Sequence, residues 1–296
     1  MLFSGHETFH IREGWLHKGL KAVNSDPFLF SDPHATDHLG VGKNMVSSIR
    51  YWLIASKLAE ETKVKAGEKI KTKLELSRVG KTLWKYDPYL EEDLSLWIIH
   101  CQLASNKERA TSWYWLFNQF SMRRFDGQTF VTYISRWITD NSKKKVVLNS
   151  LQKDLNCLIR TYTQPSLKHR KVSPEDSFEC PLATLRLMDG LENTGTYKLN
   201  LGQRDVPLDV FGYGVLQFLA SAPSREVRLN ELATLPSSPG RLFLLSSESI
   251  VSLCERLEDK YGKRKFSYTR TAGLNLLKVG NIDIIDFVKE SYEARK

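Results

Sequence analysis

The chain has 296 residues, of which 41% are hydrophobic and 26% are charged, so it can bury a substantial core and is not disordered as a whole. It has no uninterrupted apolar run of roughly 18 residues, and its start, MLFSGHETFH, has neither the basic nor the apolar region of a secretory signal. We therefore expect neither a membrane span nor export, and we expect a cytoplasmic protein. Lys and Arg number 43 against 34 Asp and Glu, a formal net charge of +9, which favours a polyanionic partner.

Much of this positive charge lies in one segment near the N-terminus. From Lys43 to Lys85 the sequence has eleven basic and four acidic residues, as expected for a surface that follows phosphate groups. A lysine-rich hairpin that is merely solvated is the alternative interpretation. The elements predicted around the segment favour the first interpretation.

These elements begin with two predicted helices. Asp32 and Pro33 form a helix start, and the glycines at 40 and 42 end the short helix HATDHL. A second helix is predicted from Lys43 to about Glu60. Its packed face is expected to comprise Met45, Val46, Ile49, Trp52, Leu53 and Ser56, and its other face Asn44, Ser47, Ser48 and Tyr51.

The next stretch, TKVKAGEKIKTKLEL, predicts a basic hairpin with its turn at Ala66 and Gly67, and Ser77 is expected to cap the helical turn RVGKTLW. Short helix, glycine turn, longer helix and basic hairpin predict a winged helix-turn-helix, whose second helix enters the major groove of DNA. There Asn44 suits adenine, and lysines and arginines suit phosphates. The residues that we expect to contact DNA are Lys43, Asn44, Ser47, Ser48, Arg50 and Tyr51 in the helix, Lys65, Lys69, Lys71 and Lys73 in the hairpin, and Arg123, Arg124 and Lys153 further on.

Two apolar segments follow the acidic stretch DPYLEED. LSLWIIHCQLA predicts a buried helix, in which His100 is interpreted as a core histidine rather than a ligand. ATSWYWLFNQF places Trp113, Leu116, Phe117 and Phe120 on one helix face, which favours core packing over the stacking of unpaired bases. Arg123 and Arg124 after it suit either a helix C-terminus or phosphate.

A second candidate helix pair comes next. TFVTYISRWI is amphipathic, KKK at 143–145 lies in the connection, and Ser150 is expected to cap a further helix. That helix is predicted to turn Leu151, Leu155, Leu158, Ile159 and Tyr162 inward and Gln152, Lys153, Asn156 and Arg160 outward. This resembles another helix-turn-helix, and both DNA contact and a purely packing role stay open.

The last part follows a proline-containing linker predicted over residues 163–181. It contains a strand, YKLNL, a helix, PLDVFGYGVLQFLA, a strand, GRLFLL, and a helix, SESIVSLCERLEDKYG, capped by Ser246, and no repeat is detected. The predicted fold class is mainly α with small β hairpins (α+β). We expect a winged helix-turn-helix domain over residues 1–86, a helical domain with the second helix-turn-helix-like unit over 87–165, and an α+β domain over 166–296.

The motif closest to a catalytic pattern is HETFH, which matches the H-E-x-x-H signature of zinc peptidases. Its place at the N-terminus, directly after Gly5 and without a further ligand at the usual spacing, argues against zinc, and none is expected. His6 and Glu7 are instead candidates for proton transfer or metal binding in phosphodiester cleavage. The alternative is a polar cluster in which Glu7 pairs with Arg12. The cysteines at 101, 157, 180 and 254 are too far apart for a C-x-x-C pair and are expected to be buried, reduced thiols.

Several long strings resemble one bacterial family, catalogued as domain of unknown function 4007: FSGHETFHIREGWLHKGL, LGVGKNMVSSIRYWL, DPYLEEDLSLWIIHCQLASN, TSWYWLFNQF, LQKDLNCLIRTY, EDSFECPL and SPGRLFLL. The family's best-known role is the B component of the Ssp system, which inserts sulfur into one strand of DNA. The resemblance implies a nicking endonuclease in phosphorothioate modification and anti-phage defence, with a cysteine desulfurase, an ATP pyrophosphatase and an ATPase as partners. Magnesium or another divalent cation is a conditional expectation. A non-catalytic DNA-binding recruiter of the sulfur machinery is the alternative.

Overall fold

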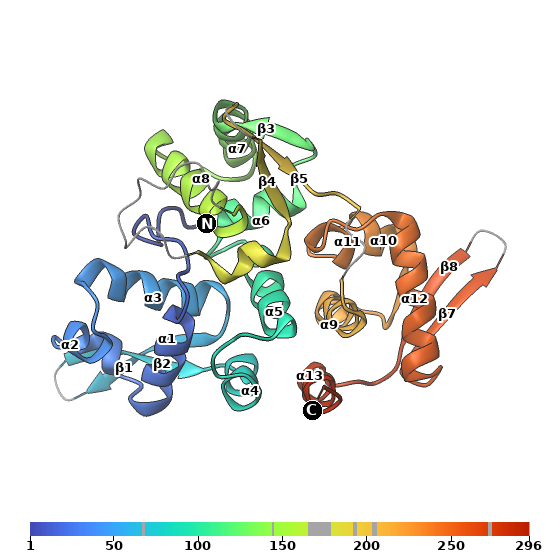
Figure 1. The fold of residues 1–296 in the computed structure, drawn as a ribbon, viewed down its shortest axis with the longest axis horizontal. Helices are drawn as coiled ribbons and strands as arrows, with labels where there is room; N and C mark the ends of the chain where they lie inside the picture. The colour runs from blue at the N-terminus through green and yellow to red at the C-terminus, as the bar shows by residue number, and fades with distance from the viewer. Residues whose placement is uncertain are drawn as a thin grey trace. The chain divides into compact units, whose positions relative to one another are not determined.

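The computed structural model describes residues 1–66, 69–143, 145–164, 179–191, 194–202, 206–271 and 274–295. The fold is α+β, as predicted, with helices and short strands intermixed along the chain (Figure 1). The chain divides into two compact units: unit 1 holds Met1–Trp115 and Arg124–Lys198, and unit 2 holds Leu116–Arg123 and Leu199–Lys296. These units differ from the three predicted domains, whose boundaries stay a prediction. The expected linker falls mostly outside the described ranges.

The N-terminal part of unit 1 contains the two predicted helices, preceded by a helix and a 3-10 turn that were not predicted. α1 (Trp15–Ser25) and the 3-10 turn η1 (Leu29–Ser31) precede α2 (Ala35–Leu39) and α3 (Lys43–Ala55). The prediction that Asp32 caps this short helix and that Pro33 opens it is wrong, because α2 begins at Ala35 with His34 as its N-cap. Asp32 Oδ1 instead accepts a hydrogen bond from the His34 amide at 2.7 Å in the turn before the helix. Gly40 turns the chain towards α3 with a φ of +61°, which glycine adopts without strain.

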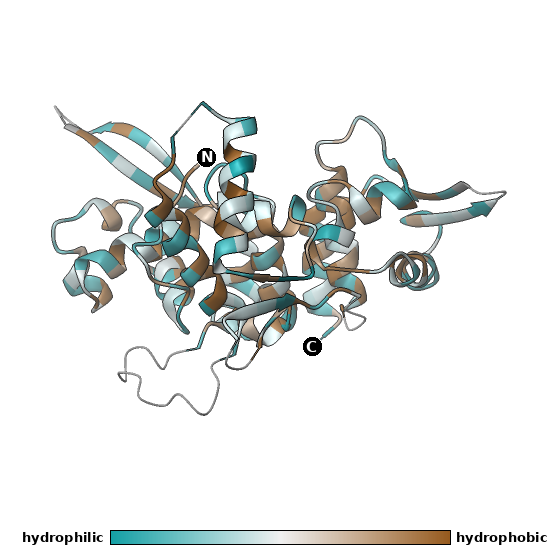
Figure 2. Ribbon diagram, turned by 90° about the horizontal axis from the view of Figure 1, so that it is seen from above, coloured by the Kyte–Doolittle hydropathy of each residue, from teal (hydrophilic) through white to brown (hydrophobic). Residues whose placement is uncertain are grey.

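A two-stranded hairpin follows α3. The helix ends at Ala55 rather than near Glu60, because Lys57 takes a φ of +51° and the chain enters β1 (Ala59–Ala66). β1 pairs with β2 (Lys69–Leu76) in antiparallel register from Ala59 opposite Leu76 to Ala66 opposite Lys69. Much of this hairpin consists of hydrophilic residues, drawn in teal in Figure 2.

The hairpin leads into α4 (Arg78–Tyr86), which begins where it was predicted to begin. The hydroxyl of Ser77 accepts a hydrogen bond from the Gly80 amide at 3.0 Å, which confirms Ser77 as the N-cap.

The next helices along the chain form the core that was predicted, and unit 1 is interrupted after Trp115, within the second of them. α5 (Asp93–Ala104) is buried from Leu94 onward, and the His100 ring hydrogen-bonds the Tyr162 hydroxyl at 2.8 Å, as a core histidine does. The aromatic face of α6 (Thr111–Asn118) is buried. After α7 (Gly127–Asn141), α8 (Leu148–Tyr162) begins with Val147 as its N-cap, so the prediction of Ser150 as the cap is wrong: Ser150 lies in the first turn.

Unit 2 contains α9 (Leu208–Leu219), β6 (Glu226–Arg228), α10 (Leu229–Thr234), α11 (Pro239–Leu242), α12 (Ser247–Tyr261), β7 (Phe266–Thr271), β8 (Leu274–Val279) and α13 (Ile284–Glu293). The prediction of a strand for GRLFLL is wrong. This segment begins inside α11, where the Ser238 hydroxyl accepts a hydrogen bond from the Arg241 amide and Pro239 is the first helical residue. An apolar run of this length suits a buried helical turn as well as a strand. Ser246 caps α12 as predicted.

A similar order of elements, in which a strand is followed by helices and then by a hairpin, recurs along the described chain. β3 (Arg124–Asp126), α7, α8, the 3-10 turn η4 (Pro181–Leu185), β4 (Met188–Leu191) and β5 (Thr196–Leu199) form one set, with sheet order β3-β5-β4. In unit 2, β6, α10, α11, α12, β7 and β8 form another set, with sheet order β6-β8-β7. In both, the first strand pairs with the last, and its final residue is the N-cap of the next helix.

The N-terminal elements are a reduced version of this pattern. α2 and α3 precede the β1–β2 hairpin, and a backbone hydrogen bond from the Leu74 amide to the Pro27 carbonyl at 2.8 Å stands where the first strand would pair. The sequence gives no sign of this repetition.

The four cysteines are all free and buried, as expected. Burial raises the pKa of the Cys180 and Cys254 thiols to about 12. No helix in the described part of the chain is both long and apolar enough for a membrane crossing.

Candidate nucleic-acid interface

The first two turns of α3 expose three of the side chains that were predicted to contact DNA. Lys43, Asn44 and Ser47 are exposed, whereas Val46, Ile49 and Trp52 on the other side are buried. This amphipathic pattern leaves a cation, an amide and a hydroxyl at one end of the helix. These groups can hydrogen-bond phosphate oxygens and base edges.

Two further predicted contacts on α3 point elsewhere. Ser48 is fully buried, and its Oγ donates to the His6 carbonyl oxygen at 3.0 Å, so the prediction of Ser48 as a DNA contact is wrong. Tyr51 is half-buried: its ring meets those of His6 and Trp52 edge-on, and its hydroxyl donates to the Arg109 carbonyl at 3.0 Å. Burial raises the pKa of Tyr51, so its hydroxyl stays protonated in this setting.

Arg50 is engaged in an ionic network at the base of the hairpin. Its guanidinium hydrogen-bonds the Glu61 carboxylate, which also accepts from Arg109 Nη2 at 2.6 Å. Burial alone would raise the pKa of Glu61, but the two arginines outweigh it and hold the pKa below its ordinary value. Arg50 therefore carries a charge that is already balanced, which weakens it as a phosphate ligand.

The hairpin distributes its lysines over both faces. Lys65 lies opposite Ile70 and Lys71 opposite Val64, so the two lysines stand on opposite faces, and both are exposed. Lys73 pairs with Glu75 at 2.9 Å. The side chain of Lys69, also predicted to contact DNA, lies outside the described residues.

The predicted catalytic residue His6 is part of a buried hydrogen-bond network. Its Nε2 lies 2.9 Å from Asp154 Oδ1, and the same oxygen accepts from the Ser4 amide at 2.7 Å. The second carboxylate oxygen accepts from the Ser112 hydroxyl at 2.6 Å. The ring stacks on Trp52 at 6.0 Å with an interplanar angle of 15°.

His6 is 0% exposed, so in this conformation it cannot touch a phosphodiester, and its assignment as catalytic is contradicted. Together with the Ser48 bond, the network ties the N-terminal segment to α3, α6 and α8.

Glu7 and Arg12 do not form the pair that was considered for them. The HETFH segment is a turn rather than a helix, with φ of +50° at Glu7 and +68° at Thr8, so His6 and His10 are not one helical turn apart. Glu7 is exposed, and in the described part of the chain no ion pair joins it to Arg12. Arg12 is buried, with its guanidinium over the ring of Trp15 at 5.1 Å.

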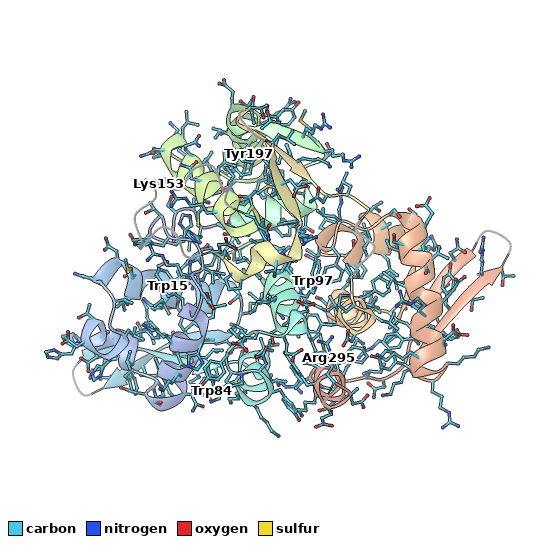
Figure 3. The ribbon with its side chains drawn as sticks, viewed as in Figure 1. Trp15, Trp84, Trp97, Lys153, Tyr197 and Arg295 are labelled. Carbon is cyan, nitrogen blue, oxygen red and sulfur yellow. The ribbon has the colours of Figure 1, made fainter. Side chains whose placement is uncertain are left out.

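The other predicted contacts lie further along the chain. Arg123 and Arg124 are exposed but follow the end of α6 by several residues, so a role at that helix C-terminus is excluded. Lys153 is exposed on α8 (Figure 3), as are Lys143 and Lys145 in the preceding connection, whereas Lys144 lies outside the described residues.

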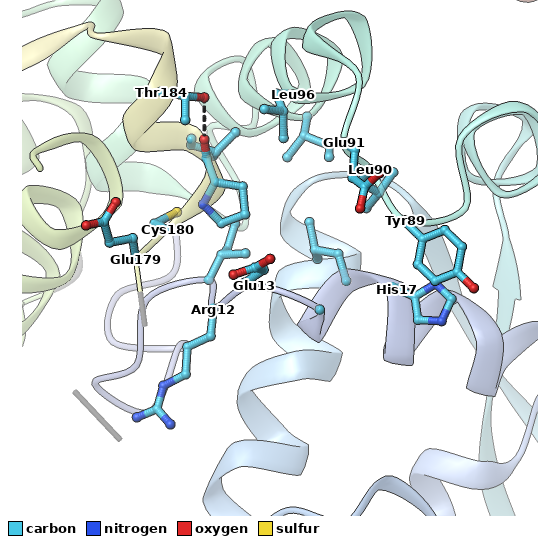
Figure 4. Close-up of a pocket in the computed structure, with 16 residues that line it drawn as sticks. Arg12, Glu13, His17, Tyr89, Leu90, Glu91, Leu96, Glu179, Cys180 and Thr184 are labelled. Atoms are coloured by element: carbon cyan, nitrogen blue, oxygen red, sulfur yellow. Dashed lines mark hydrogen bonds between the residues drawn. The ribbon is translucent and has the colours of Figure 1, made fainter. Parts of the chain in front are cut away.

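Unit 1 also contains a cavity of about 390 Å³ between the start of α1, the residues before α5 and the start of η4 (Figure 4). Of the predicted site residues, only Arg12 lines it. Its walls include His17, stacked on Tyr89 at 4.5 Å, and Thr184, whose hydroxyl donates to the Pro181 carbonyl at 2.7 Å.

The described residues do not assemble a dedicated ligand set for a metal ion. No three His, Cys, Asp or Glu side chains among them gather closely enough to hold one. Magnesium is commonly held by one or two carboxylates together with water and substrate phosphates, so a magnesium site needs fewer protein ligands than such a cluster.

Two carboxylates that organise the two networks, Asp154 and Glu61, were not predicted from the sequence. For Asp154 a signal existed: it falls on the inward stripe of its helix with Leu151, Leu155 and Leu158, and a carboxylate on a buried stripe needs a polar partner. Nothing local pointed to Glu61, because it depends on an arginine 48 positions away.

The fold and surface define a class: an α+β protein in which pairs of helices are followed by β hairpins, with a cationic helix face and a basic hairpin near the N-terminus. The chain belongs to the family described as Protein of unknown function (DUF4007), whose model matches residues 3–292. This confirms the resemblance drawn from the sequence strings.

Two solved structures are similar, an SspB crystal structure and a magnesium ion-bound SspB crystal structure, with TM-scores of 0.89 and 0.88. Each is 30% identical, and each match covers 98% of this chain and 88% of the other. A comparison with curated proteins gives no match.

Proposed function

We propose that this protein is a DNA-binding nicking endonuclease of a phosphorothioate modification and anti-phage defence system. The similarity to SspB at 30% identity over 98% of the chain supports a role in such a system. The observation that carries the DNA-binding part is the exposed end of α3, with Lys43, Asn44 and Ser47, beside a hairpin with exposed Lys65 and Lys71.

In this proposal α2, α3 and the β1–β2 hairpin act as a winged helix-turn-helix. α3 is the recognition helix, and its N-terminal residues contact base edges in the major groove. Asn44 supplies bidentate pairing to adenine, and Ser47 supplies a hydroxyl to a base or phosphate. Lys43, Lys65 and Lys71 neutralise phosphates, which gives affinity without sequence preference.

The chemistry is proposed to be hydrolysis of one phosphodiester bond in duplex DNA with the assistance of a divalent cation. Of the two candidate catalytic residues, only Glu7 is exposed and available to a substrate. A carboxylate there can orient water or hold a hydrated magnesium ion against a phosphate. No further residue is assigned to the cation.

The proposed partners follow from the same system. The nick would expose a strand end for a cysteine desulfurase, an ATP pyrophosphatase and an ATPase, which together insert sulfur. Duplex DNA is the partner on which this chain acts first.

A second function deserves a test because His6 is buried and the described residues show no gathered metal ligands. In that case the protein binds DNA and recruits the sulfur machinery without cutting. Supercoiled plasmid incubated with the purified protein and Mg²⁺ separates the two proposals. Conversion to open circles supports the nickase, and tight DNA binding without any break supports the recruiter.

The same plasmid assay locates the chemistry. Glu7→Gln is expected to abolish nicking while duplex binding is retained, and Glu13→Gln, at another exposed glutamate nearby, serves as the matched control. Nicking at the wild-type rate by Glu7→Gln would remove Glu7 from the proposal.

A further inference from the structure

α8 occupies the same position in its set of elements as α3 does in the N-terminal set. Each is the second helix of a pair, and each precedes a β hairpin, β1–β2 after α3 and β4–β5 after α8. In the three-stranded sheet that contains β4 and β5, the second hairpin strand, β5, is the central one. In a winged helix-turn-helix this is the position of the recognition helix. α8 lies in unit 1 with α3, so both belong to one compact body.

The exposed face of α8 has the chemistry of a DNA-contacting helix. Asn149, Gln152, Lys153 and Asn156 are exposed at helical spacing, and Arg160 continues the same face. The amides of Gln152 and Asn156 are joined by a hydrogen bond of 3.1 Å, which aligns two groups suited to adenine edges.

The acidic group of α8 is removed from that face. Asp154 is the one carboxylate in residues 148–162, and it is buried against His6 and Ser112. The exposed surface therefore carries positive charge without a neighbouring carboxylate from the helix itself. Lys143 and Lys145 add two exposed cations in the connection that leads into α8.

In unit 2 the helix before the hairpin is α12, which follows α10 and the short α11, and it shows that this chemistry does not come with a place before a hairpin. Its exposed and half-exposed charges are four acidic and two basic residues: Glu248, Glu255, Glu258, Asp259, Arg256 and Lys260. Such a face repels phosphates. α3, by contrast, has no acidic residue between 43 and 55, and so matches α8.

We propose that the exposed face of α8, with Lys143 and Lys145, is a second surface for duplex DNA. The choice of DNA as its ligand rests on the proposed DNA-binding function, but this surface is separate from α3 and the β1–β2 hairpin. The His6 network holds the two helices in one body, because His6 hydrogen-bonds Ser48 of α3 and Asp154 of α8. Two surfaces on one body raise the affinity for a duplex that reaches both.

The test measures binding of the full chain to a labelled 30-bp duplex, by fluorescence anisotropy at several salt concentrations. Three double variants each remove two exposed positive charges. The α8 variant is Lys145→Ala with Lys153→Ala, the hairpin variant is Lys65→Ala with Lys71→Ala, and the control on α12 is Arg256→Ala with Lys260→Ala. Thermal unfolding of each variant verifies that its fold is retained.

A plot of the logarithm of the DNA-binding constant against the logarithm of the salt concentration has a slope that becomes less steep by about 0.9 for each lost phosphate contact. We therefore expect the slope of the α8 variant to be less steep than that of the wild type by about 1.8, and the slope of the α12 control to be unchanged. An α8 variant that binds like the control, while the hairpin variant is weakened, overturns the second surface and leaves the proposed function standing. Loss of binding in the α8 variant alone supports the second surface and removes the hairpin from the proposed function. A wild-type chain that ignores duplex in dilute salt overturns both.

Discussion

The assignment of His6 to a structural network predicts a large loss of stability when Asp154 is truncated. Asp154→Ala leaves the Ser4 amide, the His6 ring and the Ser112 hydroxyl without the carboxylate that they now share at 2.6 to 2.9 Å. An orphaned buried polar group costs about 1–3 kcal/mol, and breaking a buried pair costs about 3–5 kcal/mol. Because the three groups can relax partly, we expect a total of about 4 kcal/mol.

The assay is thermal unfolding followed by circular dichroism. For a unit of this size each kcal/mol shifts Tm by about 2–4 °C, so Asp154→Ala is expected to lower Tm by about 8–16 °C. Asp154→Asn keeps the shape and part of the hydrogen bonding, and should lose about half as much. Asp140→Ala, at an exposed aspartate of α7, is the control and should stay within about 0.5 kcal/mol of wild type.

Two results would refute this reasoning. An unchanged Tm for Asp154→Ala would mean that the network contributes nothing to stability. A His6→Ala variant that keeps the wild-type Tm and DNA affinity but no longer nicks would return His6 to a catalytic role.

Three further predictions concern stability and reactivity. Glu61→Gln should lower the free energy of unfolding by about 1 kcal/mol or less at pH 7. Because the arginines depress the pKa of Glu61 in the folded state, the Tm difference between the variant and the wild type should have its full size above about pH 4.5 and should vanish as the pH falls further. Cys180 and Cys254, with pKa values of about 12, should resist a thiol reagent at pH 8 until the protein is unfolded, and rapid labelling of the native protein would contradict their burial. Gly80→Ala would drive a Cβ into the Leu58 carbonyl oxygen and should cost about 1–3 kcal/mol in urea unfolding, whereas Gly42→Ala meets no atom within 4 Å and should be near neutral; equal stabilities of the two variants would show that the backbone at Gly80 yields.

The elements near the N-terminus could be predicted because their signals are local. The Ser77 cap, the glycine turn at Gly40 and the apolar stripe of α3 each act within a few residues of chain. The same locality explains why α8 was found with its inward and outward faces correct apart from its first turn.

What failed depends on contacts between distant segments. Ser48 has the helical position of an exposed residue, but the N-terminal segment lies over it and takes its hydroxyl. His6 finds its partner 148 positions away, and GRLFLL becomes helical because Ser238 and Pro239 open a turn there. The repeated order of elements was not predicted from the sequence, because it is defined by pairing between strands that lie far apart along the chain.

The most direct test of the central claim, that α3 and the hairpin grip duplex DNA, compares Asn44→Ala with Lys71→Ala. The wild-type chain first selects its preferred duplex from a random pool, and the affinities of all three proteins for that duplex and a scrambled one are then measured across salt. We expect Asn44→Ala to lose about 1–3 kcal/mol on the preferred duplex alone, and Lys71→Ala to weaken both duplexes alike and reduce the salt slope by about 0.9. Equal effects of the two variants on both duplexes, or no selection by the wild-type chain, would contradict the claim.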